Sequence, residues 1–251
     1  MNNNNRKPVQ SRILYKSEAC IVINKCGGEA VEGLASKPAQ ERMSDPRREL
    51  AAMPDMNTGI IEAVNRLDVP VTGCALFALT KPALSFLGRA FSDAGSVKKI
   101  YWAIVEKPPH AIPESGELVH WIETKSSLNK SFAHNESGPG RKKAALRYRI
   151  SGEGENYLFT EIELFSGRHH QIRAQFARAG LHIRGDLKYG AKRSEKNGGI
   201  RLHARFLAFP DPLNRNGTIS VTADPPQMDN LWQAFLDKCA ECQRLNQNNT
   251  Y

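Results

Sequence analysis

Long hydrophobic runs are absent from this sequence, and so is an apolar N-terminal segment. The longest apolar runs, such as Cys74–Leu79, fall far short of the roughly 20 residues that a membrane-spanning helix requires. The N-terminus, MNNNNRKPVQ, has no apolar core of the kind that a secretory signal peptide needs. We therefore expect a soluble, cytoplasmic protein that does not bind a membrane.

Cysteine is scarce. The five cysteines are dispersed and odd in number, which argues against a disulfide framework in a chain without an export signal. Cys239 and Cys242 form a C-x-x-C pattern, but no second cysteine pair or nearby histidine completes a zinc site. The histidines His169, His170, His182 and His203 match no common metal-site spacing, so we predict no metal.

Acidic residues are nearly missing from one segment. The net charge of the chain is +9, and residues 168–205 hold ten Lys and Arg against only Asp186 and Glu195. A solvated basic face is one explanation of such a run. Concentrating most of the surplus in one segment, however, is what a polyanion-binding surface requires, so we favour a nucleic-acid partner.

Apolar periodicity predicts more strands than helices, with many strands consecutive. We expect α+β architecture with a mixed, largely antiparallel central sheet flanked by helices and long loops. One domain is expected over residues 11–245, between disordered tails at 1–10 and 246–251. Predicted strands cover 13–15, 20–24, 74–80, 97–106, 145–150, 157–165, 202–209 and 219–223; predicted helices cover 47–52, 82–91, 169–179 and 231–245; polar stretches 33–59 and 123–143 read as loops.

Two features of these elements bear on function. Arg173 lies beside Ile172 on the predicted helix, at or near its buried edge, and a buried arginine is costly without a carboxylate partner. We therefore expect such a partner in the fold. Tyr101 and Trp102 adjoin on a predicted strand, so they must point to opposite faces, and only one of them can line a cleft.

Five segments, in this order, resemble the RluA-type pseudouridine synthases. The resemblance covers about half of the chain and implies the pseudouridine synthase fold with a catalytic cleft. Many members of the family carry an N-terminal S4 RNA-binding domain, whereas only about ten residues precede the first strand here. The segments are ILYKSEACIVINKCGG from Ile13, NRLDVPVTGCALFALTKPA from Asn65, VKKIYWAIV from Val97, LFTEIELFSGRHHQIRAQFARAGLHIRGDLKYG from Leu158, and RLHARFLAFPDP from Arg201.

The resemblance assigns roles to three residues. Asp68 is the Asp of the family's R-L-D motif and would be catalytic, while Arg173, in the H-Q-I-R motif, would pair with it. Tyr101 matches the Tyr of the K-x-Y-x-A motif and would stack on the target base. The implied reaction is the isomerisation of uridine to pseudouridine, in which the Asp attacks C1′ or removes a proton at C2′. It calls for no cofactor.

RNA is the partner that this reaction implies, and the target uridine must leave its stack to reach the catalytic pocket. Ribosomal and transfer RNA are both plausible substrates, and we expect a monomer. The basic segments and the family motifs together predict RNA contacts from Arg66, Lys98, Lys99, Arg141, Lys142, Lys143, Arg168, His170, Arg184, Lys188 and Tyr189.

The sequence also departs from the family pattern. Asn65 stands where His is commonest before R-L-D, Ser166 and His169 each replace a Thr, and the turn at 69–72 is altered. Two other functions stay open. A non-catalytic RNA-binding protein or RNA chaperone could retain the same fold and basic cleft, and a metal-dependent nuclease could use acids and histidines.

Overall fold

The computed structural model describes residues 6–31, 44–56, 59–93, 95–195, 198–214 and 216–248, with backbone alone from residue 240 onward. The chain divides into two compact units. The first comprises residues 1–99, 196–199 and 203–226, and the second comprises 100–195, 200–202 and 227–251. The chain passes between the two units several times, and the single domain expected over residues 11–245 stays a prediction.

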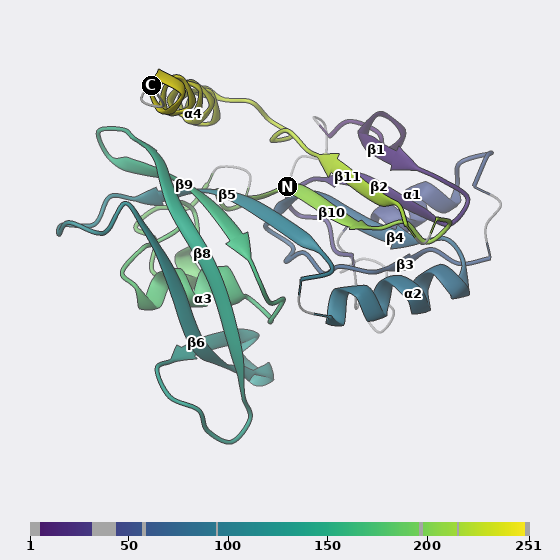
Figure 1. Cartoon of the computed structure of the whole chain (residues 1–251), viewed down its shortest axis with the longest axis horizontal. Coiled ribbons are helices and arrows are strands. Elements are labelled where there is room, and N and C mark those ends of the chain that lie inside the picture. The colour runs from purple at the N-terminus through teal and green to yellow at the C-terminus, as the bar shows by residue number, and fades with distance from the viewer. Residues whose placement is uncertain are drawn as a thin grey trace. The chain divides into compact units, whose positions relative to one another are not determined.

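The first unit is a mixed sheet. Its strands pair in the order β1, β2, β4, β10, β11, and β3 also pairs with β4; all pairs are antiparallel except the short parallel contact of β4 with β10. Helix α2 packs against β4, below the strands in Figure 1. The elements are β1 (Ile13–Lys16), β2 (Cys20–Lys25), α1 (Pro46–Ala51), β3 (Glu62–Ala63), β4 (Thr72–Ala78), α2 (Lys81–Ser92), β10 (Leu202–Pro210) and β11 (Thr218–Thr222).

Burial on both faces explains the continuous apolar runs of this unit. Cys20–Ile23 and Cys74–Leu79 are almost completely buried, as strands covered on two sides must be. Thr80 follows β4 and caps α2, because its hydroxyl oxygen accepts a hydrogen bond from the backbone amide of Ala83 at 3.2 Å. The sequence prediction of a strand followed by a helix is thus confirmed.

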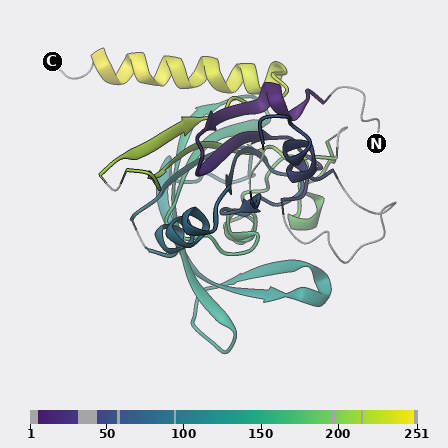
Figure 2. The ribbon, with the colours of Figure 1, turned by 90° about the vertical axis from the view of Figure 1, so that its right-hand side faces the viewer.

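The second unit is an antiparallel sheet in the order β5, β9, β8, β6, β7. Helix α3 packs on β6 and β7, whereas α4 packs on β8. In Figure 2 the teal hairpins of β6, β7 and β8 extend away from α4. The elements are β5 (Lys98–Glu106), β6 (Ser115–Lys125), β7 (Lys130–His134), β8 (Arg141–Glu153), β9 (Tyr157–Leu164), α3 (Gln171–Arg178) and α4 (Asn230–Asn248).

An aromatic cluster joins α4 to this sheet. The rings of Trp102 and Phe235 lie 4.6 Å apart, and Phe159 meets Phe235 edge-on at 5.4 Å. The Trp102 indole also donates a hydrogen bond to the Glu161 carboxylate at 3.2 Å. Trp102 therefore belongs to the core beneath α4, and Tyr101, the preceding residue of β5, points to the opposite face of the strand.

The prediction of a loop over residues 123–143 is wrong. This stretch contains the end of β6, all of β7 and the start of β8, which pair in register from Trp121 opposite His134 to Lys125 opposite Lys130. Most side chains of this hairpin are exposed or half-buried on both faces. Without one fully buried face, the strands need no apolar alternation, and the sequence carries no signal for them.

The ends of the chain carry contacts beyond the predicted boundaries. Arg6 pairs with the buried Glu29 at 3.0 Å, and Val9 is buried in a short 3₁₀-helix, Val9–Arg12. Helix α4 continues to Asn248. Residues 1–5 and 249–251 of the predicted tails lie outside the described residues, as do residues 33–43 and 57–58 of the predicted loop. The short helix expected within that loop is confirmed as α1.

Gly73 is the position in β4 where a side chain has no room. Its φ is +111°, and an added Cβ would lie 2.3 Å from the carbonyl oxygen of Ala204 in β10. We expect Gly73→Ala to lower the free energy of unfolding by about 3 kcal/mol, from backbone strain and the clash together. Urea denaturation measures this change.

Gly88→Ala is the matched control. Gly88 lies in α2, and among the described residues nothing beyond its chain neighbours and the backbone of its own helix lies within 4 Å of the position that an added methyl group would take. This variant should be as stable as the wild type or more stable by up to about 1 kcal/mol, because alanine favours a helix. Equal stability of the two variants would contradict the close approach of β4 and β10.

Candidate functional site

Asp68 lies in a tight turn that leads into β4. The backbone amide of Val71 donates a hydrogen bond to the Asp68 carbonyl oxygen at 2.9 Å, which closes the turn. Leu67 is buried and anchors the approach, Arg66 is exposed, and Asp68 is half-buried. The R-L-D motif therefore alternates outward and inward, and it holds the Asp68 carboxyl group next to a rigid strand.

A lysine that the sequence analysis missed holds this turn. Lys25 ends β2 and is fully buried, and its ammonium donates hydrogen bonds to the carbonyl oxygens of Cys26, Val69 and Val71 at 3.0, 3.1 and 2.6 Å. The Asp68 carbonyl oxygen is 3.3 Å away. Burial lowers the pKa of Lys25 to about 8. A lysine at the end of an otherwise apolar strand was the available signal.

Asn65 joins the same segment to β4. Its side-chain oxygen accepts a hydrogen bond from the Leu76 amide at 2.7 Å, and its side-chain nitrogen donates to the Cys74 carbonyl oxygen at 3.0 Å. The amide side chain thus pairs with β4 as a strand backbone would. The departure from the family's usual His has a structural role here.

His203 fixes the far end of the turn. Its Nε2 donates to the Ala223 carbonyl oxygen at 2.9 Å, so its Nδ1 accepts from the Thr72 hydroxyl at 2.8 Å. His203 is fully buried, and burial lowers its pKa to about 4. The neutral imidazole of His203 in β10 therefore joins the first residue of β4 to Ala223, the residue that follows β11.

Arg173 lies in the second unit, buried in α3. Its Nε and Nη2 donate to the two carboxylate oxygens of Asp186 at 2.6 and 2.8 Å, in a bidentate pair. The carboxylate partner expected for a buried arginine is thus present, and it is Asp186, which sequence reasoning did not single out. Asp68 belongs to the first unit, and its predicted pairing with Arg173 stays a prediction.

Tyr189 connects Arg173 to the β7 hairpin. The Arg173 guanidinium lies over the Tyr189 ring at 4.8 Å. The Tyr189 hydroxyl accepts from the Ser131 amide at 2.8 Å and lies 2.9 Å from Nδ1 of His170. His169 stacks on His170 with ring centres 3.8 Å apart. His170, predicted to contact RNA, is buried, so its contacts are mainly within the protein.

The other predicted RNA-binding residues differ in exposure. Arg184 is partly buried, and its guanidinium is engaged by Glu195 at 2.9 Å. Lys99 lies over the Phe91 ring at 6.0 Å, and burial lowers its pKa. Arg141 is half-buried. The exposed members are Arg66, Lys98, Lys142, Lys143, Arg168 and Lys188.

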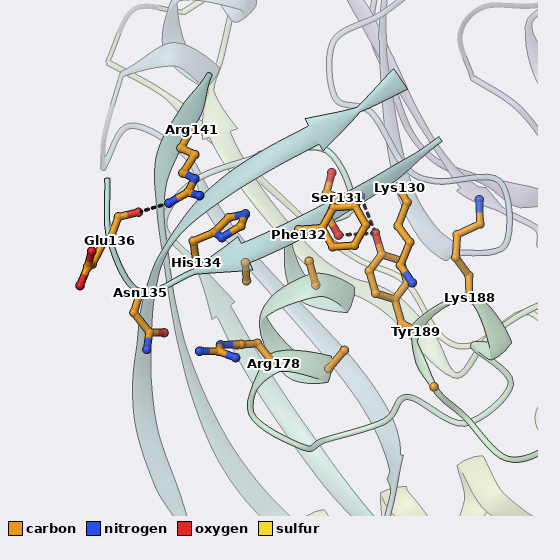
Figure 3. Close-up of a pocket in the computed structure, with 14 residues that line it drawn as sticks. Lys130, Ser131, Phe132, His134, Asn135, Glu136, Arg141, Arg178, Lys188 and Tyr189 are labelled. Atoms are coloured by element: carbon orange, nitrogen blue, oxygen red, sulfur yellow. Dashed lines mark hydrogen bonds between the residues drawn. The ribbon is translucent and has the colours of Figure 1, made fainter. Parts of the chain in front are cut away.

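A pocket of about 670 Å³ lies in the second unit, between the β7 hairpin and α3 (Figure 3). Its lining combines cationic and aromatic side chains with small and polar ones, and it includes Arg141, Lys188 and Tyr189, which the sequence predicted as RNA contacts. The lining also includes Lys130, Phe132, His134 and Arg178, which were not predicted as RNA contacts. The first three lie on β7, which was predicted as part of a loop, so no periodicity drew attention to them. Arg178 lies on the predicted helix, within the basic segment 168–205.

Metal and membrane features are not found in the part of the chain that the structure describes. No three His, Cys, Asp or Glu side chains there are grouped closely enough to hold a metal ion. No described helix combines the length and apolar character needed to cross a bilayer. The thiols of Cys20, Cys26 and Cys74 are free.

Comparison with known proteins shows one consistent family. A family model described as RNA pseudouridylate synthase matches residues 19–178, a span that includes Asp68, Tyr101 and Arg173. An uncharacterised RNA pseudouridine synthase of Zymomonas mobilis is 34% identical over 176 residues, which cover 69% of this chain and 74% of the relative. The ribosomal large subunit pseudouridine synthase D of the same organism is 25% identical over 234 residues, covering 89% and 72%.

Solved structures agree on the fold. Human RNA pseudouridylate synthase domain containing 4 superposes with a TM-score of 0.67 at 19% identity, over 92% of this chain and 94% of that one. Human RNA pseudouridylate synthase domain containing 1 superposes with a TM-score of 0.63 at 20% identity, over 89% of this chain and 94% of that one. These matches confirm the predicted fold class, a mixed and largely antiparallel α+β arrangement.

The buried His203 should make stability depend on pH. The unfolded state takes up its proton near the ordinary pKa of 6.5 and the folded state only near 4, so the unfolded state binds more protons between these values. The free energy of unfolding should therefore fall by about 3 kcal/mol as pH drops through this window. Urea denaturation at a series of pH values measures it.

His203→Gln provides the comparison, since a glutamine amide can donate and accept without titrating. The difference in unfolding free energy between wild type and His203→Gln should shrink from pH 6.5 to pH 4. Parallel profiles for the two proteins would contradict a neutral, buried His203.

Proposed function

Because the chain belongs to the RluA-type family of RNA pseudouridine synthases, which are isomerases, we propose that it converts specific uridines of ribosomal or transfer RNA to pseudouridine, with Asp68 as the single catalytic group and no cofactor. The observation that carries this proposal is the turn of Asp68. An R-L-D motif inside the matched span is held at the start of a buried strand by a buried lysine.

The reaction needs a well-placed carboxylate more than a large set of groups. The N1–C1′ bond breaks, the uracil turns within the site, and C5 joins C1′, without net redox change or hydrolysis. The Asp68 carboxylate attacks C1′ or removes the C2′ proton, and either role depends on its position to within a fraction of an ångström. The hydrogen bonds from Lys25 to the carbonyl oxygens of Val69 and Val71 restrict the movement of this turn.

Arg173 supports Asp68 as its ion-pair partner in this proposal. Asp186 engages Nε and Nη2, which fixes the plane of the guanidinium in α3. Because the plane of its guanidinium is fixed, Arg173 can donate hydrogen bonds from the remaining edge in one direction only. This restriction suits an arginine that positions the Asp68 carboxylate. The positive charge would favour the ionised form of a neighbouring carboxylate.

Tyr101 is the platform for the target base in this proposal. Trp102 is committed to the core beneath α4, which leaves Tyr101 on the other face of β5. A flipped uracil loses its stacking partners, and an aromatic ring replaces part of that energy at about 1–3 kcal/mol per base.

We infer that ribosomal RNA is the favoured substrate. Two relatives, from Zymomonas mobilis and Vibrio parahaemolyticus, are named ribosomal large subunit pseudouridine synthases, at 25% and 26% identity. Transfer RNA stays the second candidate. An RNA chaperone that retains the fold without the chemistry is the alternative function, and it differs in one respect: its action would not need the Asp68 carboxylate.

Asp68→Asn should abolish the reaction and leave RNA binding intact. We expect tritium release from C5-tritiated uridine, in bulk RNA of cells lacking this activity, to fall by roughly 10⁴-fold, because the amide neither attacks nor takes up a proton. RNA affinity should change little, since phosphate contacts do not involve this carboxylate. Asp237→Asn, at an exposed site on α4, is the control and should release tritium normally. Release by Asp68→Asn at the wild-type rate would favour another catalytic group.

RNA affinity should fall steeply with salt. Each phosphate contact contributes roughly 0.7–0.9 to the slope of log affinity against log salt concentration. Replacing both Lys142 and Lys143 by Ala should therefore reduce the slope by about 1.5. Arg149→Ala is the control, because this arginine lies opposite Glu161 at 3.6 Å. A shallow slope for the wild type, or an equal effect of Arg149→Ala, would contradict phosphate binding by the basic cluster.

A further inference from the structure

The pocket between the β7 hairpin and α3 has a lining unlike that of a structural cavity. We propose that it is a second nucleotide-binding subsite, which takes one unpaired nucleotide of the substrate RNA with its base on Phe132 and its flanking phosphates at two groups of cations. This proposal rests on the proposed function for the identity of the RNA. Its residues lie entirely within the second unit.

Two groups of cations flank the Phe132 ring. In Figure 3, Arg141 and Arg178 approach one side of the pocket from β8 and α3, while Lys130 and Lys188 lie on the side of Tyr189. One strand of RNA carries a phosphate on each side of every nucleoside. Cations on both sides of an aromatic ring therefore match the charge pattern of a single nucleotide within a chain.

Acidic groups offset only part of this charge. Glu136 lies at the margin of the pocket in Figure 3, and its backbone carbonyl oxygen, not its carboxylate, accepts a hydrogen bond from Arg141 at 3.2 Å. Glu123 lies 2.9 Å from Nε2 of His134 and 4.0 Å from Nε of Arg141. The lining thus retains an excess of positive charge, which favours an anion.

Phe132 is a half-buried aromatic residue on the β6–β7 hairpin. The ammonium groups of Lys125 and Lys130 lie 5.4 and 5.6 Å from its ring centre. Partial exposure of a phenylalanine has no benefit for folding, because its apolar surface stays in water. Stacking of a base would cover that surface, and the nearby lysines would attract the adjoining phosphate.

The floor of the pocket is open because the residues of α3 are small. Ala174 and Ala177 face the hairpin, and Tyr189 closes one end. Three hydrogen bonds, to the backbone nitrogen and oxygen of Ser131 and to His170, hold the Tyr189 hydroxyl. The cavity is therefore preformed, and its volume of about 670 Å³ lies within the range of about 300–1,000 Å³ for small-molecule pockets.

Single-stranded RNA fits this pocket better than a duplex does. A base inside a helix is stacked on both faces and cannot lie on a side-chain ring, whereas loops and bulges present bases that can. The Arg173 guanidinium contacts the same Tyr189 ring that closes the pocket, so an occupied subsite would lie beside the Arg173–Asp186 pair. It would thereby contribute to substrate choice.

The test measures binding of a short fluorescein-labelled oligouridylate by anisotropy, with the full chain. Phe132→Leu, which keeps apolar volume without an aromatic face, should weaken binding about tenfold, and Phe132→Tyr should restore it. Phe165→Ala is the matched control: Phe165 is also exposed, with the Arg147 guanidinium 5.3 Å from its ring centre, and lies outside the pocket. This variant should bind as the wild type does.

An oligonucleotide with abasic sites distinguishes the contribution of base stacking to affinity from that of phosphate binding. The wild type should bind it about tenfold more weakly than oligouridylate, whereas Phe132→Leu should bind both equally, because its stacking contact is already lost. Three results would overturn the proposed subsite. The first is an oligouridylate affinity of Phe132→Leu equal to that of the wild type, and the second is an equal loss of affinity in Phe165→Ala. The third is a wild-type affinity for the abasic oligonucleotide, or for oligoglutamate, equal to that for oligouridylate.

The tritium-release assay keeps this result separate from the catalytic proposal. Loss of oligouridylate binding in Phe132→Leu, with no tritium release by the wild type, would support the subsite and refute the catalytic function. Tritium release by the wild type, with unchanged binding by Phe132→Leu, would refute the subsite alone. A matching thermal unfolding midpoint for Phe132→Leu and the wild type excludes misfolding as the cause of lost binding.

Discussion

A buried ammonium bound to backbone carbonyl oxygens is the interaction on which the candidate catalytic turn depends. Lys25 is removed from water at the end of β2, and the carbonyl groups of Cys26, Val69 and Val71 replace its hydration. A turn that moved the carbonyl oxygens of Val69 and Val71 away would leave this buried charge with fewer acceptors. Asn65 and His203 add bonds from each side to β4, so the turn is held by side chains from several distant segments.

The second unit combines a buried core with an exposed hairpin. One part of its core lies beneath α4, where Trp102 and Phe235 meet, and another lies between α3 and the sheet, where Ile122 and Ala174 are buried. The outer end of the β6–β7 hairpin is largely exposed, and it carries charge and an aromatic ring at the surface. Such a division is common where a rigid scaffold supports a binding loop or hairpin.

Several elements could be predicted from the sequence because local pattern decides them. The apolar runs of β2 and β4, the capped start of α2 and the alternation of β9 each follow from burial and turn chemistry. The hairpin at 123–143 could not be predicted, because strands with two exposed faces carry no period. Lys25 and Asp186 were missed for a different reason: their importance lies in partners that are distant in sequence, such as Val69 for Lys25.

The sequence by itself determined the family, the fold class and the candidate catalytic aspartate, because ordered motifs such as N-R-L-D and H-Q-I-R are local strings of residues. Only the tertiary structure decided that Asp186 holds Arg173, that Lys25 holds the turn of Asp68, and that Phe132 lies among cations from β7, β8 and α3. These contacts join segments brought together by folding, and the energy of such a contact depends on distance and burial, which no single segment contains.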